Sequence, residues 1–452
     1  MEQPVKKDDR VILTIQDISN EGEGVGKVQD FTLFVPQTVT GDEVEVLVLK
    51  TKKSYGYGQL LQLLKPSPLR QEPLCPVAHE CGGCQLQHLQ YEEQLKWKTQ
   101  KVREVLRRIG GLADCEVEDT LGMEEPFNYR NKVQYPIRQE EGLLKIGFFA
   151  QGTHRVVASE GCQLQNKSVQ EIVEAVRGYL EEEQVSIYNE TTHKGLVRHL
   201  LIKTAYYTQD KMVGLVINGQ SIPHPEKLIE RLKKIEGVRS ILLNHQLEKS
   251  PVLLGEEITL LYGTDTIRDQ IGQLQFKISP LSFFQVNPTQ TERLYAKVLE
   301  FAELTGKETV WDAYCGMGTI SLFLAQRAKA VYGVEIVPEA IQMAKENARL
   351  NGITNATFLV GKAEEVLPKA YQEGILADTV VVDPPRKGCD PKLLETLVAM
   401  SPQKIVYVSC DPATLARDLK YLTTAGYNVL KVQPVDMFPQ TVHVETVVKL
   451  SR

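Results

Sequence analysis

The sequence predicts three parts: an α/β domain built on a doubly wound parallel sheet, an α+β domain before it, and an all-β barrel at the N-terminus. From Ser279 to the C-terminus, strand and helix patterns alternate, which is typical of a parallel sheet with helices on both faces. Short strand patterns separated by turn residues fill Val11 to Leu64, and strand and helix patterns are mixed over about 127–275. A chain of 452 residues also exceeds one hydrophobic core, so two or three domains are expected.

Composition and charge exclude several classes of protein. Subtracting 58 acidic from 52 basic residues gives a net charge of −6, which argues against general coating of nucleic acid but permits local basic patches. The first residues do not resemble a signal peptide, and no run of about 18 apolar residues could cross a membrane. We therefore expect a cytoplasmic protein without membrane contact. Its eight cysteines are better explained as reduced thiols, nucleophiles or metal ligands than as disulfides.

The predicted barrel covers residues 1–66, and the glycine-rich stretch 20–27 is expected to be one of its turns. Cations and aromatic rings occur together near its end, a mixture that single-stranded RNA binders use, although an exposed hairpin without function fits equally well. These residues are Lys50, Lys52, Lys53, Tyr55 and Tyr57. Four prolines between Pro66 and Pro76 then mark a linker. One amphipathic helix is expected from Tyr91 to Ile109, where apolar residues recur at helical spacing.

A nucleotide site is expected at the carboxyl edge of the predicted parallel sheet. Gly316 and Gly318 join a strand to a helix, so that backbone can approach a ligand there, and the next strand ends in Glu335, which could bind both hydroxyls of a ribose. These features fit NAD and S-adenosylmethionine equally. Asp383, followed by two prolines, forms a rigid acidic corner and favours the methyl donor, although it could merely cap a turn. Tyr314 either lines this site or packs in the core.

Cys410 follows a later strand of the same sheet, so its thiol should lie at the same edge as Asp383 and Glu335. C5 of a pyrimidine is a weak nucleophile until a thiolate adds to C6. After methyl transfer a base must remove the C5 proton, so that the thiolate can leave. His443 and Glu445 stand two apart in the last predicted strand, hence on one face, and a buried Glu445 with a raised pKa would suit this role. A structural role is the alternative for Cys410 and the favoured one for His443.

Four further cysteines form a candidate metal site. Cys75, Cys81 and Cys84 follow a C-x5-C-x2-C pattern, and Cys162 could complete the set. Thiolates at this spacing bind zinc or an iron–sulfur cluster, and unmetallated thiols remain an alternative. Because the chemistry outlined above needs no electron transfer, a cluster here would be structural or would position RNA.

Six short segments carry a resemblance to a known family: SFFQVN at 282–287, DAYCGMGT at 312–319, GVEI at 333–336, DPPRKG at 383–388, SCDPATLARD at 409–418 and HVETV at 443–447. In combination they make the chain resemble, over nearly its whole length, the TRAM-domain 23S ribosomal RNA (uracil-5-)-methyltransferases. The resemblance implies that S-adenosyl-L-methionine is the donor, that Cys410 is the nucleophile and that Glu445 takes the C5 proton. The implied donor-binding residues are Gln285, Tyr314, Glu335 and Asp383.

The resemblance also implies a domain division and partners. The TRAM (OB-like) RNA-binding barrel would be 1–66, the central domain 67–90 with 125–275, and the Rossmann-like methyltransferase domain 91–124 with 276–452. Cys75, Cys81, Cys84 and Cys162 would hold a [4Fe–4S] cluster. Arg130 and Lys132 would be candidate phosphate contacts, although a plain exposed strand fits their composition equally well. The expected substrate is 23S ribosomal RNA, because the related transfer-RNA enzymes are expected to lack the barrel. We expect a monomer without an obligate protein partner. Some members of the resembling family, from Gram-positive bacteria, modify two uridines, and no residue of this sequence indicates whether it has one target or two.

Four alternatives remain open at this point. The first is a transfer-RNA uracil-5 methyltransferase, and the second is an RNA N-methyltransferase that uses the Asp383 corner and for which Cys410 is incidental. The third is an RNA-binding iron–sulfur protein without turnover. A nicotinamide dehydrogenase is the fourth, and it leaves Cys410, Glu445 and the barrel without a role.

Overall fold

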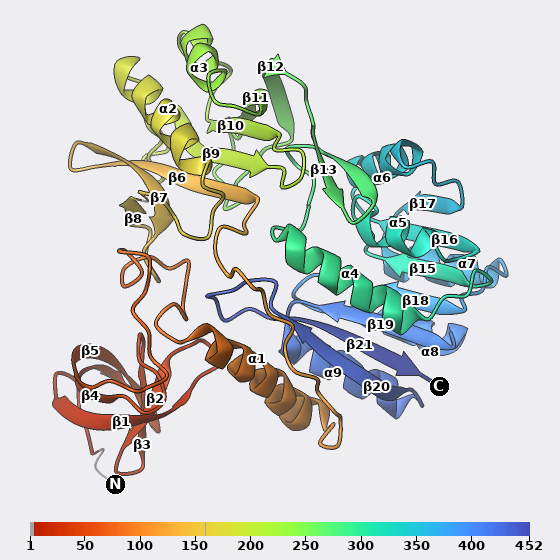
Figure 1. The fold of residues 1–452 in the computed structure, drawn as a ribbon, viewed down its shortest axis with the longest axis horizontal. Coiled ribbons are helices and arrows are strands. Elements are labelled where there is room, and N and C mark those ends of the chain that lie inside the picture. Colours follow the sequence, from red (N-terminus) through yellow and green to blue (C-terminus); the bar gives the residue numbers. More distant parts are fainter. Residues whose placement is uncertain (1–3, 159) are drawn as a thin grey trace.

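The computed structural model describes residues 4–158 and 160–452, and it contains a barrel and two large sheets (Figure 1). The barrel closes in the order β1-β2-β3-β5-β4. Its strands are β1 (Arg10–Ile18), β2 (Gly24–Val28), β3 (Phe31–Val35), β4 (Glu43–Thr51) and β5 (Tyr55–Lys65). The predicted all-β barrel is therefore confirmed.

The glycine-rich stretch 20–27 forms a turn only in its first half, because strand β2 begins at Gly24, so the turn prediction is wrong for 24–27. A Cβ atom on Gly24 would lie 1.9 Å from Thr38 Oγ1, and one on Gly26 would lie 2.4 Å from Leu13 Cδ1. Glycine is disfavoured in strands in general, but here only glycine lets β2 approach the interior of so small a barrel. The packing of the barrel thus overrides the local propensity.

The central sheet has the order β12-β11-β10-β9-β6-β7-β8. Its strands are β6 (Lys132–Glu140), β7 (Leu143–Phe149), β8 (Val156–Ala158), β9 (Val197–Thr204), β10 (Lys211–Ile217), β11 (Val238–His245) and β12 (Glu257–Gly263). Two amphipathic helices, α2 (Val169–Glu182) and α3 (Pro225–Leu232), pack on one face, where Val173 and Leu228 join a common apolar cluster with Leu200. This is the predicted α+β arrangement.

The third sheet has the order β17-β16-β15-β18-β19-β21-β20, and only the β21 pairings are antiparallel. Its strands are β15 (Thr309–Ala313), β16 (Ala330–Glu335), β17 (Ala356–Val360), β18 (Thr379–Val382), β19 (Lys404–Ser409), β20 (Asn428–Val435) and β21 (Glu445–Ser451). Its helices are α4 (Pro288–Ala302), α5 (Thr319–Ala325), α6 (Pro338–Leu350), α7 (Ala363–Gln372), α8 (Pro391–Met400) and α9 (Pro412–Thr424). Helices α4 to α6 bury their apolar side chains in one cluster and α7 to α9 in a second, so the sheet is doubly wound as predicted.

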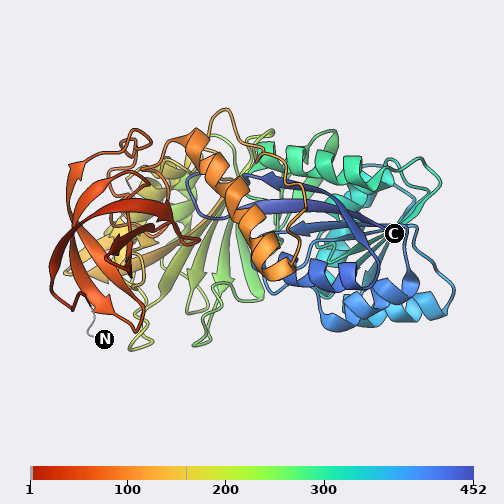
Figure 2. The same cartoon turned by 90° about the horizontal axis from the view of Figure 1, so that it is seen from below.

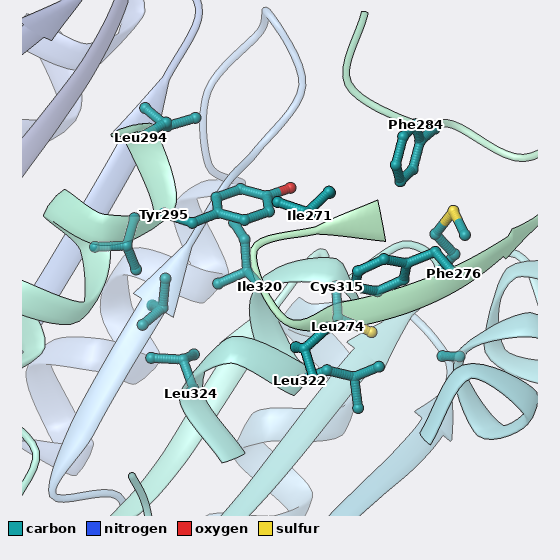
Figure 3. Close-up of a cluster of buried hydrophobic side chains, with 14 of the residues drawn as sticks. Ile271, Leu274, Phe276, Phe284, Leu294, Tyr295, Cys315, Ile320, Leu322 and Leu324 are labelled. Carbon is teal, nitrogen blue, oxygen red and sulfur yellow. The ribbon is translucent and has the colours of Figure 1, made fainter. Parts of the chain in front are cut away.

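A hairpin from β13 (Ile267–Ile271) to β14 (Leu274–Ile278) belongs to the core of this third sheet. Figure 3 shows Ile271, Leu274 and Phe276 beside Ile320 and Leu322. The domain boundary expected between 275 and 276 therefore falls inside β14.

Helix α1 (Tyr91–Val105) continues as a π-helical turn, Leu106–Gly110, so the predicted helix is present. It lies between the barrel and the third sheet, as Figure 2 shows. The segment after it runs along β20, where the Glu118 amide donates to Val432 O and the Leu121 amide donates to Pro434 O. Among the described residues, no helix is both long and apolar enough to cross a membrane.

Candidate active site

One cavity of about 710 Å³ opens at the carboxyl edge of the parallel strands. Its lining brings together all six residues that the sequence predicts for catalysis and donor binding: Gln285, Tyr314, Glu335, Asp383, Cys410 and Glu445. Strand order reverses between β15 and β18, and ligands of open α/β sheets bind at such a switch point. The fold therefore collects these side chains from segments that are far apart in the sequence.

Strand ends explain why most of these residues meet. Glu335 ends β16, while Asp383 and Cys410 directly follow β18 and β19. Glu445 begins β21, which is antiparallel, so its first residue lies at the same edge. Tyr314 follows β15 with a φ of 69°, a conformation that is rare outside glycine and concentrates at functional sites; it lines the cavity and also packs against the adjacent core.

Glu335 is held by backbone amides. The Gly316 amide donates to Glu335 Oε2 at 3.2 Å, and the Val337 amide donates to Oε1 at 3.0 Å. These bonds fix the carboxylate at the mouth of the glycine turn, where a ribose would meet it.

Gln285 is held by the central sheet, which sequence reasoning missed. Asn131 donates from Nδ2 to Gln285 O at 2.9 Å, and its amide donates to Val286 O. Lys203 of β9, itself buried, donates from Nζ to the carbonyl oxygens of Ser279 and Ser282. The side-chain hydrogen bonds among these contacts join residues that lie 76 to 154 positions apart in the sequence, which no local pattern can reveal.

Two carboxyl groups and one thiol in the cavity have pKa values well above their ordinary ones. Burial raises the pKa of Asp383 to about 7. The pKa of Glu445 is raised to about 8 by burial and by the charge of Asp383, while Arg386 opposes the shift. Burial, then Glu445 and Asp383, raise the pKa of the Cys410 thiol to about 12. A cation bound in this cavity would lower all three pKa values and favour the thiolate.

His443 lies in the loop before β21 and not in the strand, so the prediction that it shares a strand face with Glu445 is wrong. It nevertheless lines the same cavity, with its ring 6.0 Å from that of Phe438. Burial and nearby cations, first Arg386, lower the pKa of His443 to about 4, so the imidazole is neutral at physiological pH.

The four cysteines of the candidate metal site line a second cavity of about 310 Å³. Arg386, Phe438 and His443 line both cavities, so the two adjoin. Burial raises the pKa of Cys84 to about 12, and the other thiols add to the shift. Over residues 4–158 and 160–452, however, no group of three or more His, Cys, Asp or Glu side chains is arranged to hold a metal ion. The predicted metal site is therefore not confirmed.

The two candidate phosphate contacts, Arg130 and Lys132, lie in different surroundings. Arg130 lines the cysteine cavity, whereas Lys132 is partly buried opposite Lys203 in the β6–β9 pair. Sequence reasoning missed Arg386, which lines both cavities; its position directly after the Asp-Pro-Pro corner is the signal that could have placed it at this edge.

Comparison with known proteins gives the class. A family model for tRNA (uracil-5-)-methyltransferase matches residues 90–452, and a TRAM domain model matches residues 9–61. An uncharacterized RNA methyltransferase of Clostridium tetani is 52% identical over 99% of this chain and 97% of its own, and one of Bacillus cereus is 49% identical over 100% and 98%.

A solved structure agrees. The tRNA (uracil-54, C5)-methyltransferase of Pyrococcus abyssi, in complex with S-adenosyl-L-homocysteine, aligns with a TM-score of 0.78 and 32% identity, covering 97% of this chain and 100% of its own. Fold and site therefore define an S-adenosylmethionine-dependent RNA methyltransferase. The chain belongs to the tRNA (uracil-5-)-methyltransferase family, with an N-terminal TRAM domain.

Proposed function

We propose that this protein methylates C5 of uridine in 23S ribosomal RNA through a covalent adduct between Cys410 and C6 of the base. The observation that carries the proposal is the position of Cys410 opposite Glu445, in the cavity that also contains Asp383 and the predicted donor residues. An N-methyltransferase would need the acidic corner but would have no use for a thiol and a second buried carboxyl group beside it.

The chemistry follows in four steps. The Cys410 thiolate adds to C6, the electron pair of the 5,6 double bond forms a double bond between C4 and C5, and the carbonyl π pair of C4 moves onto its oxygen to give an enolate. C5 of this enolate attacks the sulfonium methyl, and S-adenosylhomocysteine leaves. Glu445, as a carboxylate, takes the C5 proton. The C–H electron pair re-forms the double bond and expels the thiolate. A carboxyl group whose pKa is raised to about 8 is a stronger base than an exposed one, which supports this role for Glu445.

The donor subsite is assigned to Gln285, Tyr314 and Glu335. Their support is the shared cavity and the backbone hydrogen bonds that orient the Glu335 carboxylate. Asp383 adjoins both this subsite and Glu445, which suits a role at the target base.

The second candidate substrate is transfer RNA. The Pyrococcus abyssi enzyme named for tRNA aligns with 97% of this chain, so the alignment includes most of the barrel. The expectation that tRNA enzymes lack the barrel is therefore wrong for this relative, and 23S ribosomal RNA rests on the motif resemblance alone. The barrel, with Arg130 at the cysteine cavity, is the proposed RNA-holding surface for either substrate.

A [4Fe–4S] cluster on Cys75, Cys81, Cys84 and Cys162 remains part of the proposal. Its support is that the four thiols line one cavity and that neighbouring thiolates add to the raised pKa values of Cys81, Cys84 and Cys162, so that these thiolates need a positive partner. Iron and sulfide analysis after anaerobic purification tests it. Wild type should contain both elements and Cys84→Ser should lose them; equal content in the two proteins would contradict the cluster.

Trapping with 5-fluorouridine tests the main proposal. The protein is mixed with S-adenosylmethionine and either a 23S RNA fragment or a transfer RNA that contains 5-fluorouridine, and each mixture is run on a denaturing gel. Fluorine cannot leave as a proton, so wild type should form a stable protein–RNA band and Cys410→Ala should form none. A band with only one RNA identifies the substrate. Radioactive methyl on a base nitrogen, with no band from either RNA, would overturn the proposal.

A further inference from the structure

The loop 436–444 joins β20 to β21 and carries Phe438 and His443 to the wall shared by the two cavities. Val435 pairs with Glu445 where the loop begins and ends, so its conformation also sets how the Glu445 strand starts. Asp436 and Gln440 are fully buried, and Gln440 has a φ of 69°. Such a loop needs partners for its buried backbone and side chains.

One face of helix α1 supplies these partners. Tyr91, Gln94, Lys98 and Lys101 recur at i, i+3, i+7 and i+10, which places them in one row along the helix. We define these four residues as the polar stripe. Gln94 and Lys98 have no exposed surface, so the stripe is covered although it is polar.

The polar stripe binds the loop from end to end. Tyr91 donates from its hydroxyl to Asp436 Oδ2 at 2.9 Å, and Lys98 Nζ donates to Asp436 Oδ1 and to Phe438 O. Gln94 exchanges hydrogen bonds with Gln440: Nε2 donates to Gln440 Oε1, and the Gln440 amide donates to Gln94 Oε1.

Lys101 completes the row. Its Nζ donates to Val442 O at 2.9 Å, directly before His443, and to Asn20 O of the barrel at 2.8 Å. Its Nζ also lies over the ring of Trp97, 5.0 Å from the ring centroid, and Trp97 donates from Nε1 to Ile18 O at the end of β1. The row therefore holds the loop and the barrel together.

Stability alone does not explain a buried Lys98–Asp436 pair. Removing two charges from water costs about as much as their attraction returns, and apolar residues of similar size are often as stable or more so. Polar contacts, unlike apolar ones, select one arrangement, because each donor must meet its acceptor. The stripe forms hydrogen bonds with successive residues of the loop. Such a set of contacts can be satisfied in only one conformation of the loop.

We propose that the polar stripe positions the 436–444 loop so that Phe438 and His443 close the catalytic cavity. Tyr91, Gln94, Lys98 and Lys101 are then positioning residues for methyl transfer, and they do not touch the reacting atoms. The kinetic part of this inference rests on the proposed function, but the structural part does not.

Two variants test the stripe. Lys101→Met keeps an unbranched side chain but removes the ammonium group, and with it both hydrogen bonds and the cation–π contact with Trp97. Lys98→Met with Asp436→Leu removes both charges, so that no unpaired buried charge can unfold the protein. Lys96→Met is the matched control, because Lys96 lies on the same helix with 71% of its side chain exposed. Lys101→Arg keeps a donor and should restore the behaviour of wild type.

Two measurements decide the outcome. Hydrogen–deuterium exchange of 436–444 should be faster in both test variants than in wild type and Lys96→Met. The single-turnover rate at saturating RNA should fall about tenfold or more, since small misplacement at a site costs that much, while affinity for S-adenosylhomocysteine and the melting temperature stay unchanged. Wild-type exchange in both variants would overturn the proposal, and so would a rate loss matched by equal losses of donor affinity and melting temperature. If wild type methylates no RNA, the proposed function fails and exchange alone decides on the stripe.

Discussion

Cys410 lies opposite Glu445 at the end of the β19–β21 ladder, because Ser409 pairs with Thr446 as the last step of that ladder. Burial is the first cause of the raised pKa of Cys410, and the charge of Glu445 is the largest electrostatic contribution to it. A thiol that adds to a base and a carboxyl group that later removes a proton from the same base would need this proximity.

Replacement of Glu445, the proposed proton acceptor, should stop the reaction at the methylated covalent intermediate. In Glu445→Gln, Cys410 can still add to C6 and the methyl group can still be transferred, but the C5 proton stays, so release should slow about a hundredfold or more. A covalent band with ordinary uridine RNA and S-adenosylmethionine should then accumulate on a denaturing gel. The added change Cys410→Ala should abolish the band. A variant that turns over as fast as wild type would remove Glu445 from the mechanism.

The buried carboxyl groups should make the stability of the donor-free protein depend on pH. Because the pKa of Glu445 is raised to about 8, its protonated form favours the folded state; this contribution is complete below the ordinary pKa and is lost as pH rises through about 8. The free energy of unfolding should therefore fall by about 2–4 kcal/mol between about pH 5 and about pH 9. Urea unfolding should show a smaller fall in Glu445→Gln, which cannot ionise, and an unchanged fall in Glu395→Gln, where the carboxyl group is exposed. Parallel curves for wild type and Glu445→Gln would contradict the burial of this group.

Sequence reasoning found the residues whose position follows from strand order. Glu335, Asp383 and Cys410 each end or follow a parallel strand, and such ends share one edge of a sheet. It could not find Lys98 or Lys203, whose partners lie far away along the chain. Their burial depends on packing between domains, for which a single sequence contains no periodic signal.

The boundaries of strands were harder to predict than their presence, because contacts with other parts of the fold decide where a strand begins. His443 and Glu445 alternate as strand residues do, but the turn contacts of Thr441 hold His443 in the loop. Likewise, Gly24 and Gly26 carry turn propensity and yet form a strand, because a closed barrel leaves no room for side chains there.

The contacts between the central domain and the segment that contains Gln285 should affect the affinity of the protein for its methyl donor. Asn131→Ala removes the hydrogen bond to Gln285 O, a contact worth about 0.5–1.5 kcal/mol, so calorimetry should show binding of S-adenosylhomocysteine weakened about two- to tenfold. Asn218→Ala is the matched control: it removes a similar bond, to Gly195 O, elsewhere in the same domain. Equal affinities in wild type and Asn131→Ala would mean that the segment keeps its position without this bond.

An aromatic cluster on the barrel should bind RNA by stacking. Phe34, Tyr55 and Tyr57 lie with each pair of ring centroids 5.8 Å apart on adjacent strands, and Lys50 is the cross-strand neighbour of Tyr57. Bases stack on such rings, and a nearby cation attracts the phosphates. Tyr57→Ala should therefore weaken RNA binding about tenfold in a filter assay at fixed salt. Its effect should persist at higher salt, because stacking is not screened, whereas a Lys50→Ala effect should shrink. Ile12→Ala, an exposed apolar change on β1 of the same barrel, should bind as wild type does. If Tyr57→Ala also binds as wild type does, the cluster is not part of the RNA-binding surface.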